Sequence, residues 1–149
     1  EAWNTPFGLP PFARLDETHF LPAFEAAMAE GRANAERIAG SSDAPTFANT
    51  VEALERATRT LARVAAVFSN LASAHTSAGI EALQRTVSPR LAAFHASLNQ
   101  DPRLFARIER LYQARAELGL TPEQQRVLEL YRRQFVRAGA ALPQLERAR

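Results

Sequence analysis

The stretch Ala44-Pro-Thr-Phe-Ala-Asn-Thr-Val-Glu-Ala-Leu-Glu55 holds the end of a loop, a helix cap and the first turns of a helix. Pro45 disfavours the helical conformation at the residue before it, so the loop ends there. The side chain of Thr46 or Asn49 can accept hydrogen bonds from the unpaired backbone N–H groups of a first helical turn. Glu52 lies three residues after Asn49, which is the spacing of a capping box, although that box usually begins with Ser or Thr. The stretch predicts a helix that begins near residue 47.

Apolar residues continue at helical spacing beyond this start. Steps of three and four residues connect most of Val51, Leu54, Leu61, Val64, Phe68 and Leu71. We therefore expect one helix over residues 47–72, the longest of the chain, which would reach roughly 40 Å at 1.5 Å per residue. Alanines along it would let neighbouring helices approach closely.

A helix is also predicted over residues 18–39. Thr18 is its expected cap, and Pro22 is tolerated within the first turn. Gly31 in the interior costs about 1 kcal/mol relative to Ala. The apolar stripe of this helix consists of Phe20, Phe24, Ala27 and Met28.

Three further helices follow. One spans residues 78–98, where Pro89 in the interior costs about 3 kcal/mol and predicts either a kink or a restart with Ser88 as the cap. The next begins with Asp101 as cap and Pro102 at the first helical position. The last begins with the same pattern at Thr121 and ends near Gly139. The final LPQLERAR, 142–149, reads as the beginning of another helix.

These elements define an all-α fold. No segment alternates with a period of two between turn residues, so no sheet is expected. We predict an antiparallel bundle of four to six helices over residues 17–149, joined by short connections. An extended arm over residues 1–16 precedes it, with three prolines between Pro6 and Pro11. Its apolar side chains are expected to pack against the helices: Trp3, Phe7, Leu9 and Phe12.

The composition places the chain among ordinary globular domains. Its 149 residues suit one domain, which could bury roughly 68–70% of the unfolded surface. No apolar run approaches the length of about 18 residues that a membrane helix needs. No Cys is present, which excludes disulfides and a Cys nucleophile and fits a cytoplasmic protein. No signal-peptide pattern opens the chain, and because it begins at Glu1 we expect that residues preceded it.

The basic residues are all Arg and are unevenly distributed. Residues 101–149 carry ten Arg against six acids, whereas residues 1–50 carry three Arg against seven acids. A basic final third can favour nucleic acid or another acidic partner. Its charges, however, alternate in sign around apolar positions, as solvated helix faces do, and no nucleic-acid motif accompanies them. We predict no nucleic-acid partner; the alternating charges are Arg107, Glu109, Arg110, Arg115 and Glu117.

No arrangement of residues predicts an active site. A zinc peptidase centre needs two His one helical turn apart with a Glu beside the first, and His19, His75 and His95 do not fit that pattern. Glu52 and Glu55 share a helix face and could serve acid–base chemistry, but a solvated first turn explains them as well. The serines lie in no nucleophile motif. The residues therefore predict no catalytic, cofactor-binding or metal-binding side chain.

Several segments together resemble the thimet-oligopeptidase-like zinc metallopeptidases, most closely the bacterial peptidyl-dipeptidase (dipeptidyl carboxypeptidase) branch. Their order and spacing cover nearly the whole chain. One departure is Ser77-Ala78, where an Asn-Asp pair is common. The matching segments are PFGLPPF (6–12), HFLPAF (19–24), PTFANTVEALE (45–55), VFSNL (67–71), AHT (74–76), PRLA (89–92), LFARI (104–108), LY (111–112) and FVRAGA (135–140).

The resemblance implies that the chain is the amino-terminal part of a larger helical peptidase, truncated before the catalytic zinc domain. That downstream domain would carry His-Glu-x-x-His and a later zinc-ligand Glu, and it would be the partner of residues 1–149. The amino-terminal helices would form part of the wall of a channel for short peptides, from whose carboxyl end dipeptides are released. No catalytic residue maps onto this chain, so the chain by itself is predicted to be inactive and to hold no zinc.

Two alternatives remain beside this interpretation. One is a stand-alone helical protein-interaction module without peptidase activity. The other is a nucleic-acid-binding helical protein, supported only by the basic final third. As a fragment of a longer peptidase, the chain would expose an apolar face that the remaining chain normally covers, and we expect this face to make the isolated piece self-associate.

Overall fold

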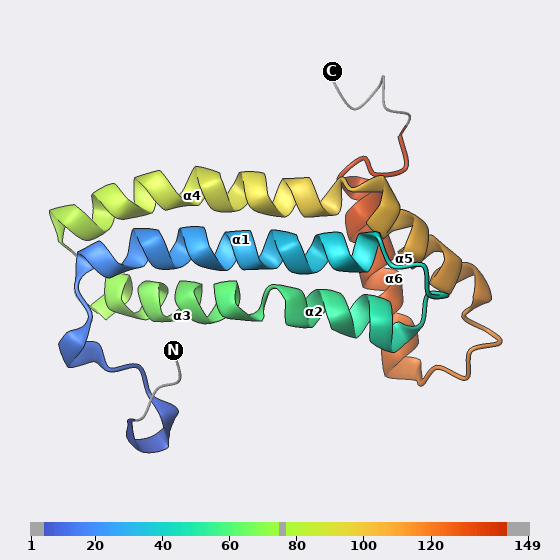
Figure 1. Cartoon of the computed structure of the whole chain (residues 1–149), viewed down its shortest axis with the longest axis horizontal. Coiled ribbons are helices and arrows are strands. Elements are labelled where there is room, and N and C mark those ends of the chain that lie inside the picture. Colours follow the sequence, from blue (N-terminus) through green and yellow to red (C-terminus); the bar gives the residue numbers. More distant parts are fainter. Residues whose placement is uncertain (1–4, 75–76, 143–149) are drawn as a thin grey trace.

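The computed structural model describes residues 5–74 and 77–142, which are predominantly helical and contain no strand. The helix α1 (Phe20–Ala39) lies between α4 (Ala78–Asn99) and the consecutive α2 (Ala53–Ala57) and α3 (Arg59–Ala74), as Figure 1 shows. The helices α5 (Pro102–Ala114) and α6 (Pro122–Arg137) form a hairpin across the end of this layer where α1 stops. The all-α prediction is confirmed. Successive long helices reverse direction as expected, but the α5–α6 hairpin crosses the others instead of extending the layer.

Two groups of buried side chains hold these helices together. The first lies between α1, α3 and α4, where the Phe68 ring contacts the rings of Phe20 and Phe24 at centroid distances of 5.2 and 5.5 Å. The second lies between the end of α1, the start of α2, α5 and α6, and includes Leu104 and Leu128, both fully buried. Leu98 packs against both groups. The apolar stripes predicted from the sequence therefore identified most of the buried faces of α1 and α3.

The start of α1 differs from its prediction. Thr18 is not the cap: its backbone N–H donates to Asp16 Oδ1 at 2.8 Å, so Asp16 caps a 3-10 turn, Glu17–His19, that leads into α1. Asp precedes the turn by one residue and offers a stronger acceptor than the Thr hydroxyl. Pro22 falls in the first turn of α1 as expected.

The predicted helix 47–72 is not continuous. Thr46 and Asn49 exchange hydrogen bonds between side chain and backbone N–H, at 3.0 and 2.8 Å, so the capping box is Thr46–Asn49 and not Asn49–Glu52. A π-helical turn, Ala48–Glu52, follows the cap. The backbone then leaves helical geometry at Thr58, with φ −105° and ψ 8°, between α2 and α3.

The carbonyl group beside the break at Thr58 accepts a hydrogen bond from a side chain of α1. The amide of Asn34 donates to the backbone oxygen of Ala57 at 3.3 Å. This contact satisfies a carbonyl near the break from outside the helix, which a pattern of apolar spacing within one segment does not reveal.

The helix α4 runs through Pro89 without a restart. Ser77 caps it, since its hydroxyl accepts from the N–H of Ile80 at 3.1 Å. Ser88 is not a cap: its hydroxyl donates to the carbonyl of Gln84 at 2.8 Å inside the helix. Pro89 and Arg85 both lie on the exposed face, so the carbonyl that loses its partner at Pro89 can bind water.

The predicted starts of the last two helices and the predicted end of the last one are confirmed. Asp101 accepts from the N–H groups of Arg103 and Leu104 at 2.8 and 3.4 Å, and Thr121 forms a capping box with Gln124. Gly139 ends α6 at φ 86°, where the N–H of Ala140 donates to the carbonyl of Phe135 in a Schellman motif. The predicted helix start at 142–149 lies outside the described residues except for Leu142.

Replacing Asp101 by Ala should lower the free energy of unfolding by about 1 kcal/mol, because two N–H groups of the first turn of α5 lose their acceptor. Urea unfolding followed by circular dichroism measures the loss. Asp101→Asn is the matched control, since Asn is an equally good cap. An Ala variant as stable as the Asn variant would contradict the capping role.

The amino-terminal arm departs most from its prediction. Its described residues form 3-10 turns at Pro6–Gly8 and Phe12–Arg14 instead of one extended segment. Its apolar side chains do not pack on the helices: Phe7 is 98% exposed, Leu9 55% and Phe12 46%, and the arm extends beyond the helical layer in Figure 1. Leu15, at its root, is the residue that contacts the first core group. Trp3 lies outside the described residues.

No helix in the described part of the chain is both long and apolar enough to cross a lipid bilayer.

Candidate functional site

A groove of about 460 Å³ lies between α1 and α3, beside the root of the arm. This volume falls in the range of roughly 300–1,000 Å³ that small-molecule sites occupy. Most of its lining is apolar, so it is suited to apolar side chains. The walls include Leu15, Phe20, Ala23 and Ala27 on one side and Val64 and Val67 on the other.

A few polar side chains lie at the rim of the groove. The hydroxyl of Thr60 donates to Glu30 Oε1 at 3.1 Å and joins the two walls. At the arm end, the N–H of Asp16 donates to Nδ1 of His19 at 3.1 Å. Hydrogen bonds from the side chain and backbone of Thr18 lower the pKa of Asp16. These contacts fix the rim but leave the floor apolar.

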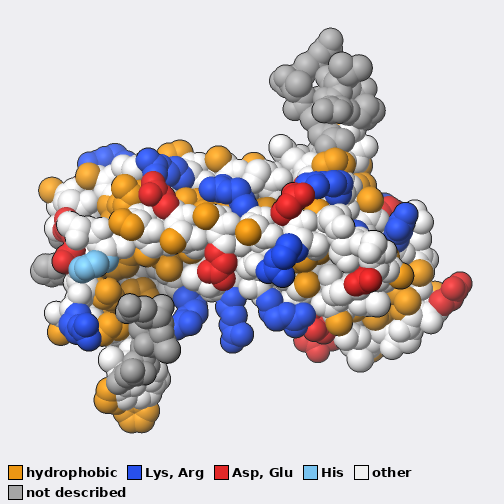
Figure 2. All heavy atoms as spheres, viewed as in Figure 1, with side chains coloured by type: hydrophobic (Ala, Val, Ile, Leu, Met, Phe, Trp, Pro, Cys, Tyr) orange, Lys and Arg blue, Asp and Glu red, His pale blue; other side chains and the backbone are white. Residues whose placement is uncertain are grey.

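Of the basic side chains on α2 and α3, Arg63 lines the groove. Arg56, Arg59 and Arg63 are exposed along α2 and α3, and Figure 2 shows basic side chains projecting along that edge of the molecule. Arg56 is paired with Glu52 at 3.2 Å. This edge disfavours a basic ligand, because like charges repel.

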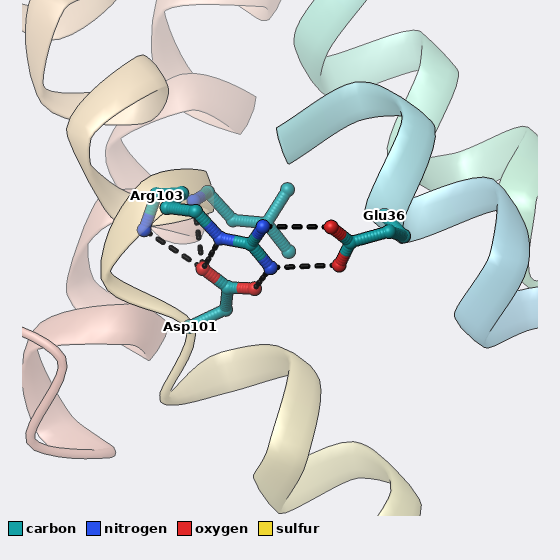
Figure 3. Close-up of polar contacts among 4 residues, drawn as sticks. Glu36, Asp101 and Arg103 are labelled. Atoms are coloured by element: carbon teal, nitrogen blue, oxygen red, sulfur yellow. Dashed lines mark hydrogen bonds and ion pairs between the residues drawn. The ribbon is translucent and has the colours of Figure 1, made fainter. Parts of the chain in front are cut away.

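A polar cluster ties the end of α1 to the start of α5 (Figure 3). Both Nη atoms of Arg103 donate to the carboxylate of Glu36, each at 2.7 Å, and the same guanidinium donates to Asp101 at 2.9 and 3.3 Å. The hydrogen bond from Arg103 lowers the pKa of Glu36. At Asp101, burial raises the pKa of the carboxyl group, but the hydrogen bonds from Arg103 and Leu104 outweigh burial, so the pKa is lowered. The cluster is a structural clamp that positions α5.

These lowered pKa values predict that the folded chain loses stability at acidic pH. Asp16, Glu36 and Asp101 bind protons more weakly in the folded chain than in the unfolded one. Their stabilisation is therefore complete above the unfolded values, near 4, and is lost as the pH falls through the folded values. Urea midpoints measured from about pH 7 to about pH 2 should decline below about pH 4. The decline should be smaller in Arg103→Gln; an identical pH profile for that variant would contradict the assignment.

Arg107 is the side chain whose surroundings differ most from the sequence-based prediction. It was predicted on a solvated helix face, but it is only 6% exposed. Its guanidinium donates to the carbonyls of Ser41 and Asp43 at 3.0 and 3.1 Å and to Asn49 Oδ1 at 3.1 Å, while its Nε has no partner among the described residues. A signal was present in the sequence, because Arg107 falls within the apolar i, i+3, i+4, i+7 stripe that begins at Leu104.

The candidate residues of the sequence do not assemble into a site. His19 lies exposed at the arm, His95 packs edge-on against Phe94 on the outside of α4, and His75 lies outside the described residues. Glu52 pairs with Arg56, and Glu55 accepts from the Tyr131 hydroxyl; burial, together with this contact, raises the pKa of Tyr131. Within residues 5–74 and 77–142 no three potential ligands lie close enough to hold a metal ion.

Comparison with known proteins identifies the class. The family model "Neurolysin/Thimet oligopeptidase, N-terminal domain" matches residues 25–147. The chain therefore belongs to the neurolysin/thimet oligopeptidase N-terminal domain family.

Individual relatives agree with this assignment. The chain is 35% identical over 144 residues to a dipeptidyl carboxypeptidase of Salmonella typhimurium and to one of Escherichia coli, and 26% identical over 145 residues to oligopeptidase A of Escherichia coli. Each alignment covers 97% of this chain but only 21% of the relative. The predicted relationship is confirmed.

Proposed function

We propose that this chain is the non-catalytic amino-terminal segment of a zinc peptidyl-dipeptidase, which releases dipeptides from the carboxyl end of short peptides. The observation that carries the proposal is the 35% identity to two dipeptidyl carboxypeptidases along nearly the whole chain. The identity to oligopeptidase A is lower, at 26%, which favours the peptidyl-dipeptidase branch.

In this proposal, zinc and the catalytic groups belong to polypeptide outside these 149 residues. The described residues do not fit a zinc site, since they bring together no three potential ligands. The role of the chain is to supply a rigid helical wall of the substrate channel. The Arg103–Glu36 clamp and the buried Arg107 support that role, because they fix the α5–α6 hairpin to the end of α1.

The first experiment is to read the source gene beyond the codon for Arg149. A long continuation that encodes His-Glu-x-x-His is expected. A stop codon close by would overturn the proposal and favour a stand-alone helical interaction module.

Activity tests the specificity. The full polypeptide should release dipeptides from a peptide with a free carboxyl end and should not cleave its amidated counterpart, while residues 1–149 alone should cleave neither. Mass spectrometry of the products measures this. Cleavage at internal bonds of the amidated peptide would point to an endopeptidase instead.

The proposed location is the cytoplasm, and immunoblotting of cell fractions tests it. Signal confined to a membrane or extracytoplasmic fraction would contradict this part of the proposal.

A further inference from the structure

The buried side chains divide the described chain into two bodies, each built around its own core. The arm-side body surrounds the first core and consists of residues 15–28, 59–74 and 77–98. The hairpin body surrounds the second core and consists of residues 35–57 and 102–142. Among the described residues, only Leu98 packs against both cores. Because closely packed cores resist deformation, each body should move as a unit.

Within the described residues, the backbone passes from one body to the other at three places. The first is the middle of α1 at Gly31, the second is the break at Thr58, and the third is the turn at 99–101 between α4 and α5. Glycine gives a helix more conformational freedom than any other residue. At the other two places no helix continues. Each passage therefore resists bending less than an uninterrupted helix without glycine.

These passages are neighbours in space. A Cβ added at Gly31 would lie 2.8 Å from Phe94 Cζ and 3.6 Å from the carbonyl oxygen of Ala57, which directly precedes the break. Phe94 itself lies shortly before the end of α4 at Asn99. Figure 1 shows the break between α2 and α3 beside the middle of α1. Motion of packed bodies is absorbed by a few residues in loops or at the ends of elements, and neighbouring passages allow rotation without stretching any of them.

The ion pairs between helices strengthen each body separately. Arg90 pairs with Glu25 within the arm-side body, and the Arg103 clamp lies within the hairpin body. A contact that spans the boundary joins neutral groups: the amide of Gln134 on α6 donates to Asn99 Oδ1 at 3.0 Å. Such a bond is weaker than one between charged groups. The boundary is therefore held less firmly than either body.

We propose that Gly31, Thr58 and residues 99–101 form a hinge about which the hairpin body rotates against the arm-side body. Gly31 suits this role because it has no side chain that would interlock with the Phe94 ring. The Arg103 clamp and the buried Arg107 keep the hairpin body rigid, so rotation changes the angle between the bodies and not their internal packing. In the proposed peptidase, on which this last step rests, the rotation moves the α5–α6 part of the channel wall relative to α3.

Distances between pairs of spin labels test the hinge, since the chain has no Cys of its own and accepts labels at chosen positions. Double electron–electron resonance measures the distribution of each distance. Ser69→Cys/Ala106→Cys spans the boundary, Ser69→Cys/Ala92→Cys lies within the arm-side body, and Ala106→Cys/Glu123→Cys lies within the hairpin body. All four positions are exposed. The distribution across the boundary should be roughly twice as broad as either of the others, because hinge rotation adds to the motion of the labels.

Removing two contacts at the boundary should loosen the hinge. Asn34→Ala/Gln134→Ala deletes the side-chain donors to the carbonyl beside the break and to Asn99. It should broaden the Ser69–Ala106 distribution further and leave both distributions within the bodies unchanged. Arg90→Gln is the matched control, because it removes an ion pair inside the arm-side body and should leave the distribution across the boundary unchanged. Circular dichroism confirms that all variants are folded.

Two outcomes would overturn the proposal. One is a distribution across the boundary that is as narrow as those within the bodies, and the other is a distribution that Asn34→Ala/Gln134→Ala leaves unchanged. These measurements use the 149-residue chain alone, so neither outcome bears on the proposed peptidase role, which the gene and the activity assay decide.

Discussion

Replacing Arg107 by Met should lower the free energy of unfolding by about 2–4 kcal/mol, because a hydrogen bond from a charged donor contributes roughly 1.5–3 kcal/mol. The variant removes the donors to the carbonyls of Ser41 and Asp43 and to Asn49. Asn49 retains its bonds with Thr46, so most of the loss arises at the two carbonyls. Urea unfolding followed by circular dichroism measures it.

The effect should be local as well as global. Because Arg107 joins α5 to the loop between α1 and residue 46, the amide protons of that loop should exchange faster in Arg107→Met. Arg107→Lys should be intermediate, because an ammonium cannot reproduce the guanidinium's divergent donors.

Arg110 provides the matched control for Arg107. It lies on the same helix but is exposed, so Arg110→Met should change stability by less than about 0.5 kcal/mol. Equal losses in the two Met variants would show that the buried contacts contribute nothing.

Replacing Phe94 by Ala should cost about 3–5 kcal/mol, the range for removing a buried aromatic side chain. Phe94 is 1% exposed, and its ring lies against Gly31 of α1. A Cβ at residue 31 would lie 2.8 Å from Phe94 Cζ, which is too close for two carbon atoms. The glycine therefore leaves the space that the ring fills.

Because Gly31 and Phe94 are in contact, the effects of substitutions at these two positions on the free energy of unfolding should depend on each other. In the wild type, Gly31→Ala should be destabilising, because overpacking costs about 1–3 kcal/mol and outweighs the gain of about 1 kcal/mol in helix propensity. In the Phe94→Ala background the ring is absent, so Gly31→Ala should become neutral or stabilising. A double-mutant cycle measures this coupling.

Gly79→Ala serves as the control for Gly31→Ala, because the atoms nearest to a Cβ at residue 79 belong to the carboxylate of Glu17, at the end of a flexible side chain. Its effect should be the same with and without Phe94. A Gly31→Ala effect that is also independent of Phe94 would refute the role of the Phe94 ring in requiring glycine at residue 31.

Local backbone chemistry was enough to predict the class of fold and most helix ends. Several helix ends depend on backbone groups within a few residues, so they can be predicted from the sequence without knowledge of the fold. They are the caps at Asp101 and Thr121, the prolines that follow these caps, and Gly139. The resemblance of the segments to a peptidase family could also be recognised from the sequence, because it depends on residue order alone. Apolar spacing also identified most of the buried stripe of α1.

Other features depended on contacts between distant segments. The helix predicted over 47–72 breaks at Thr58, beside the bond from Asn34 to the carbonyl of Ala57, and that bond exists only after α1 packs against α2. The sequence predicted that Arg107 is a surface charge, but in the structure it donates to two carbonyls of a loop more than sixty residues away. The sequence alone also could not show that the groove forms, since it needs two helices to define its walls.

The all-α class, the ends of most helices and the family of this chain could all be read from the order of its residues, because those properties reside in local backbone chemistry and in the sequence of side chains. Packing in three dimensions established which charges are buried, why Gly is favoured at residue 31, and that the described aromatic side chains of the arm are exposed. These properties depend on which side chains meet, and burial and contact energies are set by neighbours far apart in the chain.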